Sequence, residues 1–189
     1  LSNADTIILT AFQYIVSNDP NLLLAGLFPL TGLRPVEIIK VASFTTKLNN
    51  KQEHSPWYGC QLAWAKRGNM KSKYVQCRDK VFLCPYYLIE RAIALVRKRW
   101  NVKHLTNVQI NQKFNSHWNK ILRKAFPMFA GVTTKKFRRF YAVYAYHYFG
   151  KSTFLGSSSQ ASLNGFASFM LGHVSLDDQI IAYSSLVLQ

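Results

Sequence analysis

Five side chains spread along the chain have types suited to chemistry on a phosphate group. A guanidinium can form paired hydrogen bonds with phosphate oxygens. A lysine or histidine can transfer a proton, and a tyrosine oxygen can act as a nucleophile. The candidates are Arg34, Lys66, Arg138, His173 and Tyr183. Taken one at a time, each of them also has an ordinary structural interpretation.

Arg34 comes directly before Pro35, and proline is favoured at the first position of a helix. The start of a helix offers free N–H groups to an anion. An arginine at this place is therefore suited to a phosphate. The alternative is a surface arginine beside a turn, with Glu37 as its local partner.

Residues 134–149 (TKKFRRFYAVYAYHYF) form the most basic of the predicted helices. At about 100° per residue, one stripe of this helix is aromatic and is expected to pack: Phe137, Tyr141, Tyr144 and Tyr148. A basic patch lies about 140° away by the same geometry: Lys135, Arg138 and Arg139. The alternative for the patch is a solvated basic face.

The other three candidates fall on a hairpin and on the last predicted helices. Lys66 would lie at a hairpin tip, where Lys71 and Lys73 compete for the same role. His173 joins two helices in the segment Leu171-Gly172-His173, and a single histidine is usually structural. Tyr183 lies among apolar residues of a final helix, so a core tyrosine is its alternative.

The spacing of apolar residues and of turn signals predicts a mostly α-helical fold with a small antiparallel β-sheet (α+β). We expect helices at 5–18, 21–30, 36–42, 86–100, 111–126, 134–149, 165–171 and 177–188. Strands at 58–65 and 74–85 would form a hairpin around the turn 66–73. Residues 43–56 and 150–163 are expected to be loops.

Charge points to the partner. Lys and Arg number 24 against 8 Asp and Glu, a formal net charge of +16, which favours nucleic acid as the ligand. A basic ribosomal or membrane-surface protein is the alternative.

With 3 cysteines and no zinc-type spacing, structural zinc is disfavoured and a reducing cytoplasm is expected. No apolar run is long enough to span a membrane.

In this order, the candidates resemble the tyrosine recombinase superfamily of DNA breaking and rejoining enzymes. Its pattern is T-G-L-R-x-x-E, a hairpin lysine, (H/K)-x-x-R, L-G-H and then tyrosine. Residues 31–37 (TGLRPVE), Lys66, residues 135–138 (KKFR), residues 171–173 (LGH) and Tyr183 supply it. Lys135 stands where most integrases carry histidine. The chain therefore resembles telomere resolvases (protelomerases) most.

The resemblance implies a metal-free and cofactor-free reaction on double-stranded DNA. Tyr183 would attack the phosphate, Arg34 and Arg138 would hold its oxygens, and Lys66 would protonate the leaving 5′-oxygen. His173 and Lys135 would also bind the phosphate. Further DNA contacts are expected from Arg67, Lys71, Lys73 and Arg139, with Arg97, Lys98 and Arg99 as additional candidates.

The resemblance implies telomere resolution, which produces hairpin DNA ends. Strand exchange between two duplexes by a site-specific integrase or recombinase is the alternative, as is a catalytically inactive DNA-binding module. The family also implies a dimer, or a larger assembly, on DNA. We expect a bacterial or phage-encoded protein that acts in the cytoplasm.

The first residues differ in kind from the rest of the chain. Residues 1–4 include Ser2-Asn3-Ala4, which resembles a cloning scar. Residues 5–189 would then be a catalytic domain cut from a longer protein, whose N-terminal DNA-binding region is missing.

Overall fold

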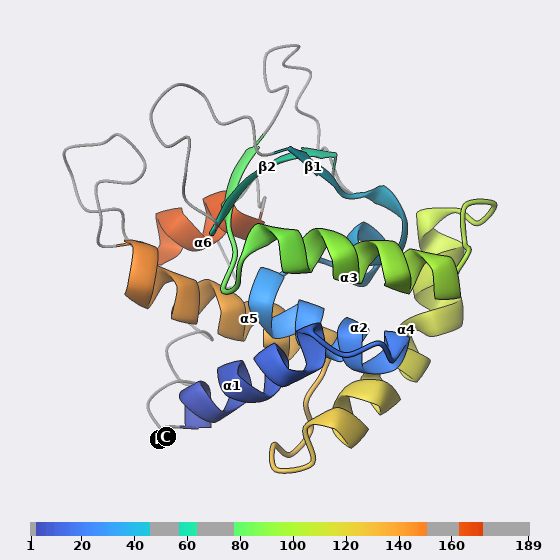
Figure 1. Cartoon of the computed structure of the whole chain (residues 1–189), viewed down its shortest axis with the longest axis horizontal. Helices are drawn as coiled ribbons and strands as arrows, with labels where there is room; N and C mark the ends of the chain where they lie inside the picture. Colours follow the sequence, from blue (N-terminus) through green and yellow to red (C-terminus); the bar gives the residue numbers. More distant parts are fainter. Residues whose placement is uncertain (1–2, 46–56, 64–77, 151–162, 172–189) are drawn as a thin grey trace.

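A computed structural model describes residues 3–45, 57–63, 78–150 and 163–171 (Figure 1). Its helices are α1 (Asn3–Ile15), α2 (Pro20–Thr31), α3 (Tyr86–Arg99), α4 (Asn107–Ala125), α5 (Thr134–Ala145) and α6 (Leu163–Leu171). Two π-helical segments, η1 (Glu37–Val41) and η2 (Tyr146–Gly150), and three strands, β1 (Ser43–Thr45), β2 (Tyr58–Ala63) and β3 (Arg78–Val81), complete it. The predicted fold class is confirmed.

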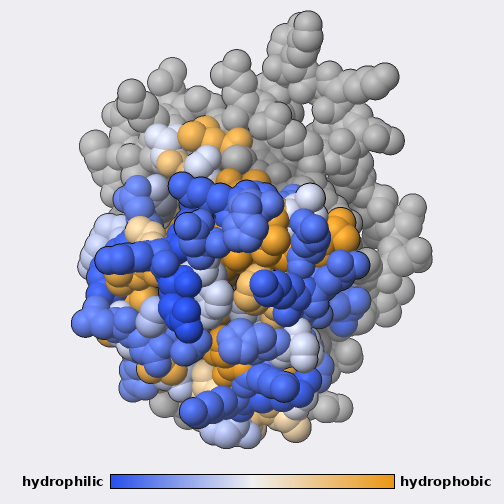
Figure 2. Space-filling model, turned by 90° about the vertical axis from the view of Figure 1, so that its right-hand side faces the viewer, coloured by the Kyte–Doolittle hydropathy of each residue, from blue (hydrophilic) through white to orange (hydrophobic). Residues whose placement is uncertain are grey.

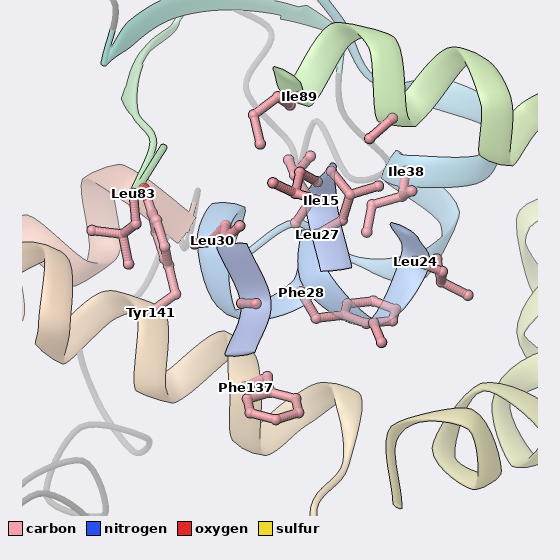
Figure 3. Close-up of a cluster of buried hydrophobic side chains, with 14 of the residues drawn as sticks. Ile15, Leu24, Leu27, Phe28, Leu30, Ile38, Leu83, Ile89, Phe137 and Tyr141 are labelled. Carbon is pink, nitrogen blue, oxygen red and sulfur yellow. The ribbon is translucent and has the colours of Figure 1, made fainter. Parts of the chain in front are cut away.

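Helix α2 lies at the centre, and α1, α3, α4 and α5 all contact it (Figure 1). Its sequence, PNLLLAGLFPLT, is apolar on every side, and each residue from Leu23 to Thr31 is buried. A helix that is apolar all round is stable only inside a protein. Figure 3 shows Leu24, Leu27 and Phe28 in the core that this helix organises.

Local signals fix both ends of α2. The Asp19 side chain accepts a hydrogen bond from the Asn21 backbone at 2.8 Å, and Pro20 takes a first-turn position. Both are signals that start a helix. The helix ends at Gly32, whose φ of 60° places it in the left-handed region. Chain direction therefore changes immediately before Arg34.

Helix α5 carries two aromatic anchors of the core. Phe137 and Tyr141 are buried, as the predicted stripe requires, and the Tyr141 hydroxyl donates to the Val81 carbonyl at 2.5 Å. Tyr148 continues the predicted stripe, because its ring lies beside that of Tyr144 with the ring centres 4.8 Å apart. It is nevertheless 57% exposed, so the stripe extends beyond the buried core.

The sheet has three antiparallel strands in the order β1-β2-β3. The predicted hairpin is confirmed, since Tyr58 pairs with Val81 and Gln61 with Arg78. Strand β1 was expected to be loop. Its three residues are too few to show the alternation of apolar and polar side chains that predicts a strand. They form a strand because they pair with β2, with Ser43 opposite Ala63.

Hydrophilic residues cover much of the described surface on the side of α3 and α4, with apolar residues between them (Figure 2). Among the described residues, no helix has both the length and the apolar character needed to cross a membrane. The helix predicted at 177–188 and the loop predicted at 150–163 lie wholly or largely outside the described residues.

The close approach of α2 and α5 depends on Gly32, the residue that ends α2. A Cβ at Gly32 would lie 2.1 Å from Cδ1 of Tyr141. Any larger residue would therefore both strain the backbone and displace a buried ring.

Gly32→Ala is expected to lower the free energy of unfolding by about 2 to 4 kcal/mol, measured by urea denaturation. About 1 kcal/mol or more comes from the left-handed backbone, and the rest from overpacking. Gly131→Ala is the matched control, because Gly131 has a similar φ of 64° and only a flexible lysine tip 3.3 Å from its added Cβ. Equal losses in both variants would contradict the role given to Tyr141.

Candidate active site

Two predicted arginines meet at one buried carboxylate. Arg34 Nη1 lies 3.1 Å from Oε1 of Glu37, and Arg138 Nη1 lies 3.7 Å from Oε2. The Arg34 backbone N–H also donates to Oε2 at 2.7 Å. The Glu37 side chain is 1% exposed, against 21% for Arg34 and 12% for Arg138. The structure thus brings together two residues that stand far apart in the sequence.

Arg138 also binds the backbone of two other segments. Its Nη1 donates to the Gly32 carbonyl and its Nη2 to the Leu171 carbonyl. Leu171 begins the L-G-H segment and ends α6. One guanidinium therefore joins residues 31–37, helix α5 and the start of residues 171–173.

Lys80, on β3, is a member of the cluster that the sequence analysis missed. The residue is 1% exposed, and its Nζ donates to the Met170 carbonyl at 3.0 Å. Nζ also lies 4.7 Å from the centre of the Tyr141 ring. A lysine in a short strand usually points to solvent, so no sequence signal distinguished this one.

The charges of the cluster favour an anion. Burial alone would raise the pKa of Glu37, but Arg138, Arg34, the Arg34 backbone N–H and Lys80 together hold this pKa below its usual 4.5. Glu37 is therefore a carboxylate at neutral pH. It balances one of the three positive charges of Arg34, Arg138 and Lys80. Paired guanidinium groups with excess positive charge suit a phosphate.

The π-helix η1 that carries Glu37 is held from α3. Arg97 Nε donates to the Ile38 carbonyl at 2.8 Å, and its Nη2 donates to the carbonyls of Glu37 at 3.0 Å and Ala42 at 2.5 Å. Arg97 was expected to be a phosphate contact. In the described structure its Nε and Nη2 are used on these backbone carbonyls, and a phosphate contact by Arg97 stays a prediction.

Lys135 and Arg139 do not join the cluster directly. Lys135 is exposed and precedes Arg138 by one helical turn, which places both on the same face of α5. Arg139 lines a cavity of about 630 Å³ between the start of α1, residues 128–132, α5 and η2, and the lining includes neither Glu37 nor Arg138. A DNA contact by Arg139 stays a prediction.

The remaining predicted residues lie outside the described part of the chain: Lys66, Arg67, Lys71, Lys73, His173 and Tyr183. Their assigned roles stay predictions. Within the described ranges, no group of three or more His, Cys, Asp or Glu side chains could hold a metal ion.

Comparison with known proteins assigns the chain to a family. The sequence model of the telomere resolvase ResT/TelK catalytic domain matches residues 1–184. The chain belongs to this family. No curated protein matches it.

Three solved structures illustrate the fold that the family shares. A selenomethionine protelomerase TelA, covalently complexed with substrate DNA, has a TM-score of 0.76 at 19% identity, over 99% of this chain and 58% of that one. A TelA mutant complexed with a DNA hairpin product gives 0.71 at 19%, over 98% and 57%. Protelomerase TelK complexed with substrate DNA gives 0.67 at 18%, over 89% and 34%. This chain spans little more than half of the TelA structures.

Glu37→Gln keeps the shape of the side chain and removes its charge, so it leaves the two arginines uncompensated. At pH 7 we expect the free energy of unfolding to fall by about 3 kcal/mol or more, as for other broken buried ion pairs. The pKa of Glu37 is lowered on folding, so its contribution is present above pH 4.5 and is lost as pH falls through the lowered value.

Urea denaturation at pH values from 7 down to 3 measures the free energy of unfolding of Glu37→Gln and of the unchanged chain. The difference between the two should become smaller as the pH falls. The exposed Glu90 supplies the control, because Glu90→Gln should change stability by no more than about 0.5 kcal/mol. A difference between Glu37→Gln and the unchanged chain that stays constant over this range would contradict the lowered pKa.

Proposed function

We propose that this chain cleaves and rejoins double-stranded DNA through a 3′-phosphotyrosyl intermediate and converts a palindromic duplex into hairpin ends. The observation that carries the proposal is the meeting of Arg34 and Arg138 at Glu37, in a chain of the telomere resolvase family. Two features support it: the net charge of +16, and the DNA bound covalently or as a hairpin in the similar structures.

In this proposal the two arginines stabilise the reacting phosphate. The Tyr183 oxygen forms a bond to phosphorus while the bond from phosphorus to the 5′-oxygen breaks. Negative charge grows on the non-bridging oxygens, where fixed hydrogen-bond donors are most effective. Arg34 exposes more of its side chain than Arg138, so we expect the larger share of direct phosphate contact from Arg34.

The protons move between side chains and the two bridging oxygens. Tyr183 loses its proton as it attacks, with His173 as the candidate acceptor. Lys66 gives a proton to the leaving 5′-oxygen, and Lys135 adds a hydrogen bond to the phosphate. The phosphotyrosyl ester keeps the energy of the broken bond. A 5′-hydroxyl can therefore reverse the step and restore the phosphodiester.

Hairpin formation requires that each 5′-hydroxyl attack the phosphotyrosine on the opposite strand. A palindromic target has two-fold symmetry, so we propose that two copies of the chain bind it as a dimer. The proposed setting is the cytoplasm of a bacterium, where chromosomal or phage DNA is accessible. Strand exchange between two duplexes uses the same cleavage chemistry and stays as the second candidate.

A nicked suicide substrate tests the cleavage chemistry, because loss of a short leaving strand prevents rejoining. The full chain should form a covalent protein–DNA adduct on denaturing gels, and Tyr183→Phe should form none while still binding DNA. Arg34→Ala should slow adduct formation by about 100-fold or more, the usual effect of removing one transition-state donor. Cleavage by Tyr183→Phe at the unchanged rate would remove Tyr183 from the mechanism.

A palindromic duplex distinguishes the two possible products. We expect each arm of the duplex to become a covalently closed hairpin, which runs on denaturing gels as one strand of twice the length of that arm. Arms of unequal length therefore give two products that both differ in length from the substrate strands. A second duplex of different arm length is included in the same reaction. Recombinant products that combine arms of the two duplexes, without hairpins, would favour strand exchange.

A further inference from the structure

Lys80 places a positive charge inside the protein, where charge is costly. Its residue is 1% exposed, and a buried ammonium group is stable only when it is well paired. The Glu37 carboxylate, whose pKa Lys80 helps to lower, stabilises this charge. So do the Met170 carbonyl at 3.0 Å and the face of the Tyr141 ring at 4.7 Å. Through the Met170 carbonyl, this charge also reaches another segment of the chain, the end of α6.

That contact lies next to one made by Arg138. Lys80 binds the carbonyl of Met170, and Arg138 binds the carbonyl of Leu171. These are the last two residues of α6, and a helix C-terminus is stabilised by positive charge. The two cations come from different elements, β3 and α5. Together they hold the end of α6 from two directions.

Tyr141 fixes the strand that carries Lys80. Its hydroxyl donates to the carbonyl of Val81, the neighbour of Lys80, at 2.5 Å, and its ring lies under Nζ. Tyr141 is itself fully buried in the core. The ammonium group therefore has little freedom to move, and the Met170 carbonyl is held in a defined place relative to the sheet.

We propose that Lys80 is a positioning residue, which holds the end of α6, the helix whose last residue begins the L-G-H segment. This inference rests on the proposed function. Lys80 acts through the backbone and does not touch DNA, because its side chain is enclosed. It is thus distinct from Lys66, the candidate general acid. It also links strand β3 of the sheet to the end of α6.

Lys80→Met tests the proposal, because it keeps the length of the side chain and removes its charge and its donors. Hydrogen exchange should become faster in peptides that cover the end of α6 and stay unchanged in α1 and α2. Single-turnover cleavage of the nicked substrate should fall by about 10- to 100-fold, as small misplacements of reacting groups produce. DNA affinity should stay unchanged. Lys120→Met, at an exposed lysine on α4, should alter neither exchange nor cleavage.

Two further measurements separate positioning from other roles. Lys80→Arg keeps a cation and donors, so it should cleave faster than Lys80→Met; equal rates would contradict the proposal. A 5′-bridging phosphorothiolate substrate has a leaving group that needs no protonation, so it should leave Lys80→Met slow. Restored cleavage of that substrate would overturn the proposal and identify Lys80 as the general acid.

Exchange rates at the end of α6 do not depend on activity. If the unchanged chain forms no adduct, the proposed function fails, and faster exchange in Lys80→Met still supports the contact. Unchanged exchange in Lys80→Met overturns the positioning role whether or not the chain cleaves DNA. Should Lys80→Met fail to fold, hydrogen exchange and cleavage are measured on Lys80→Arg. Lys80→Arg should retain slow exchange at the end of α6.

Discussion

The described structure depends on one buried carboxylate and the guanidinium groups around it. Glu37 is almost fully enclosed and stays charged because Arg138 and Arg34 stabilise the ionised form. Buried pairs of this kind contribute little net stability compared with apolar packing, but they are costly to break. Their main effect here is geometric. The carboxylate fixes the directions of two arginines that would otherwise repel each other.

Positioning at this cluster relies on backbone carbonyls as well as on side chains. Arg138 binds the carbonyls of Gly32 and Leu171, Lys80 binds that of Met170, and Arg97 binds three around η1. Each cation satisfies a carbonyl at a helix end or turn, where intrahelical partners are missing. Three cations thus join five segments of the chain: residues 32–42, β3, α3, α5 and α6.

The sequence predicted the helical elements and the hairpin because their signals are local. Apolar spacing, Asp19 before Pro20, and Gly32 after the last apolar turn lie within a few residues of what they determine. The meeting of Arg34 with Arg138 was predicted only through the order of motifs. Strand β1, the buried Lys80 and the role of Arg97 depend on contacts between distant segments. Nothing in the neighbouring residues distinguishes a lysine that points inward from one that points to solvent.

Contacts to main-chain oxygen have a consequence for how such a domain can diverge. The carbonyls that Lys80 and Arg138 bind are present whatever side chain stands at Met170 or Leu171. Substitutions there can accumulate during evolution without loss of these hydrogen bonds, provided that the helix end keeps its path. An architecture held in this way can persist at 18 to 20% sequence identity, because many of the hydrogen bonds that hold it are accepted by backbone oxygens, which every amino acid has.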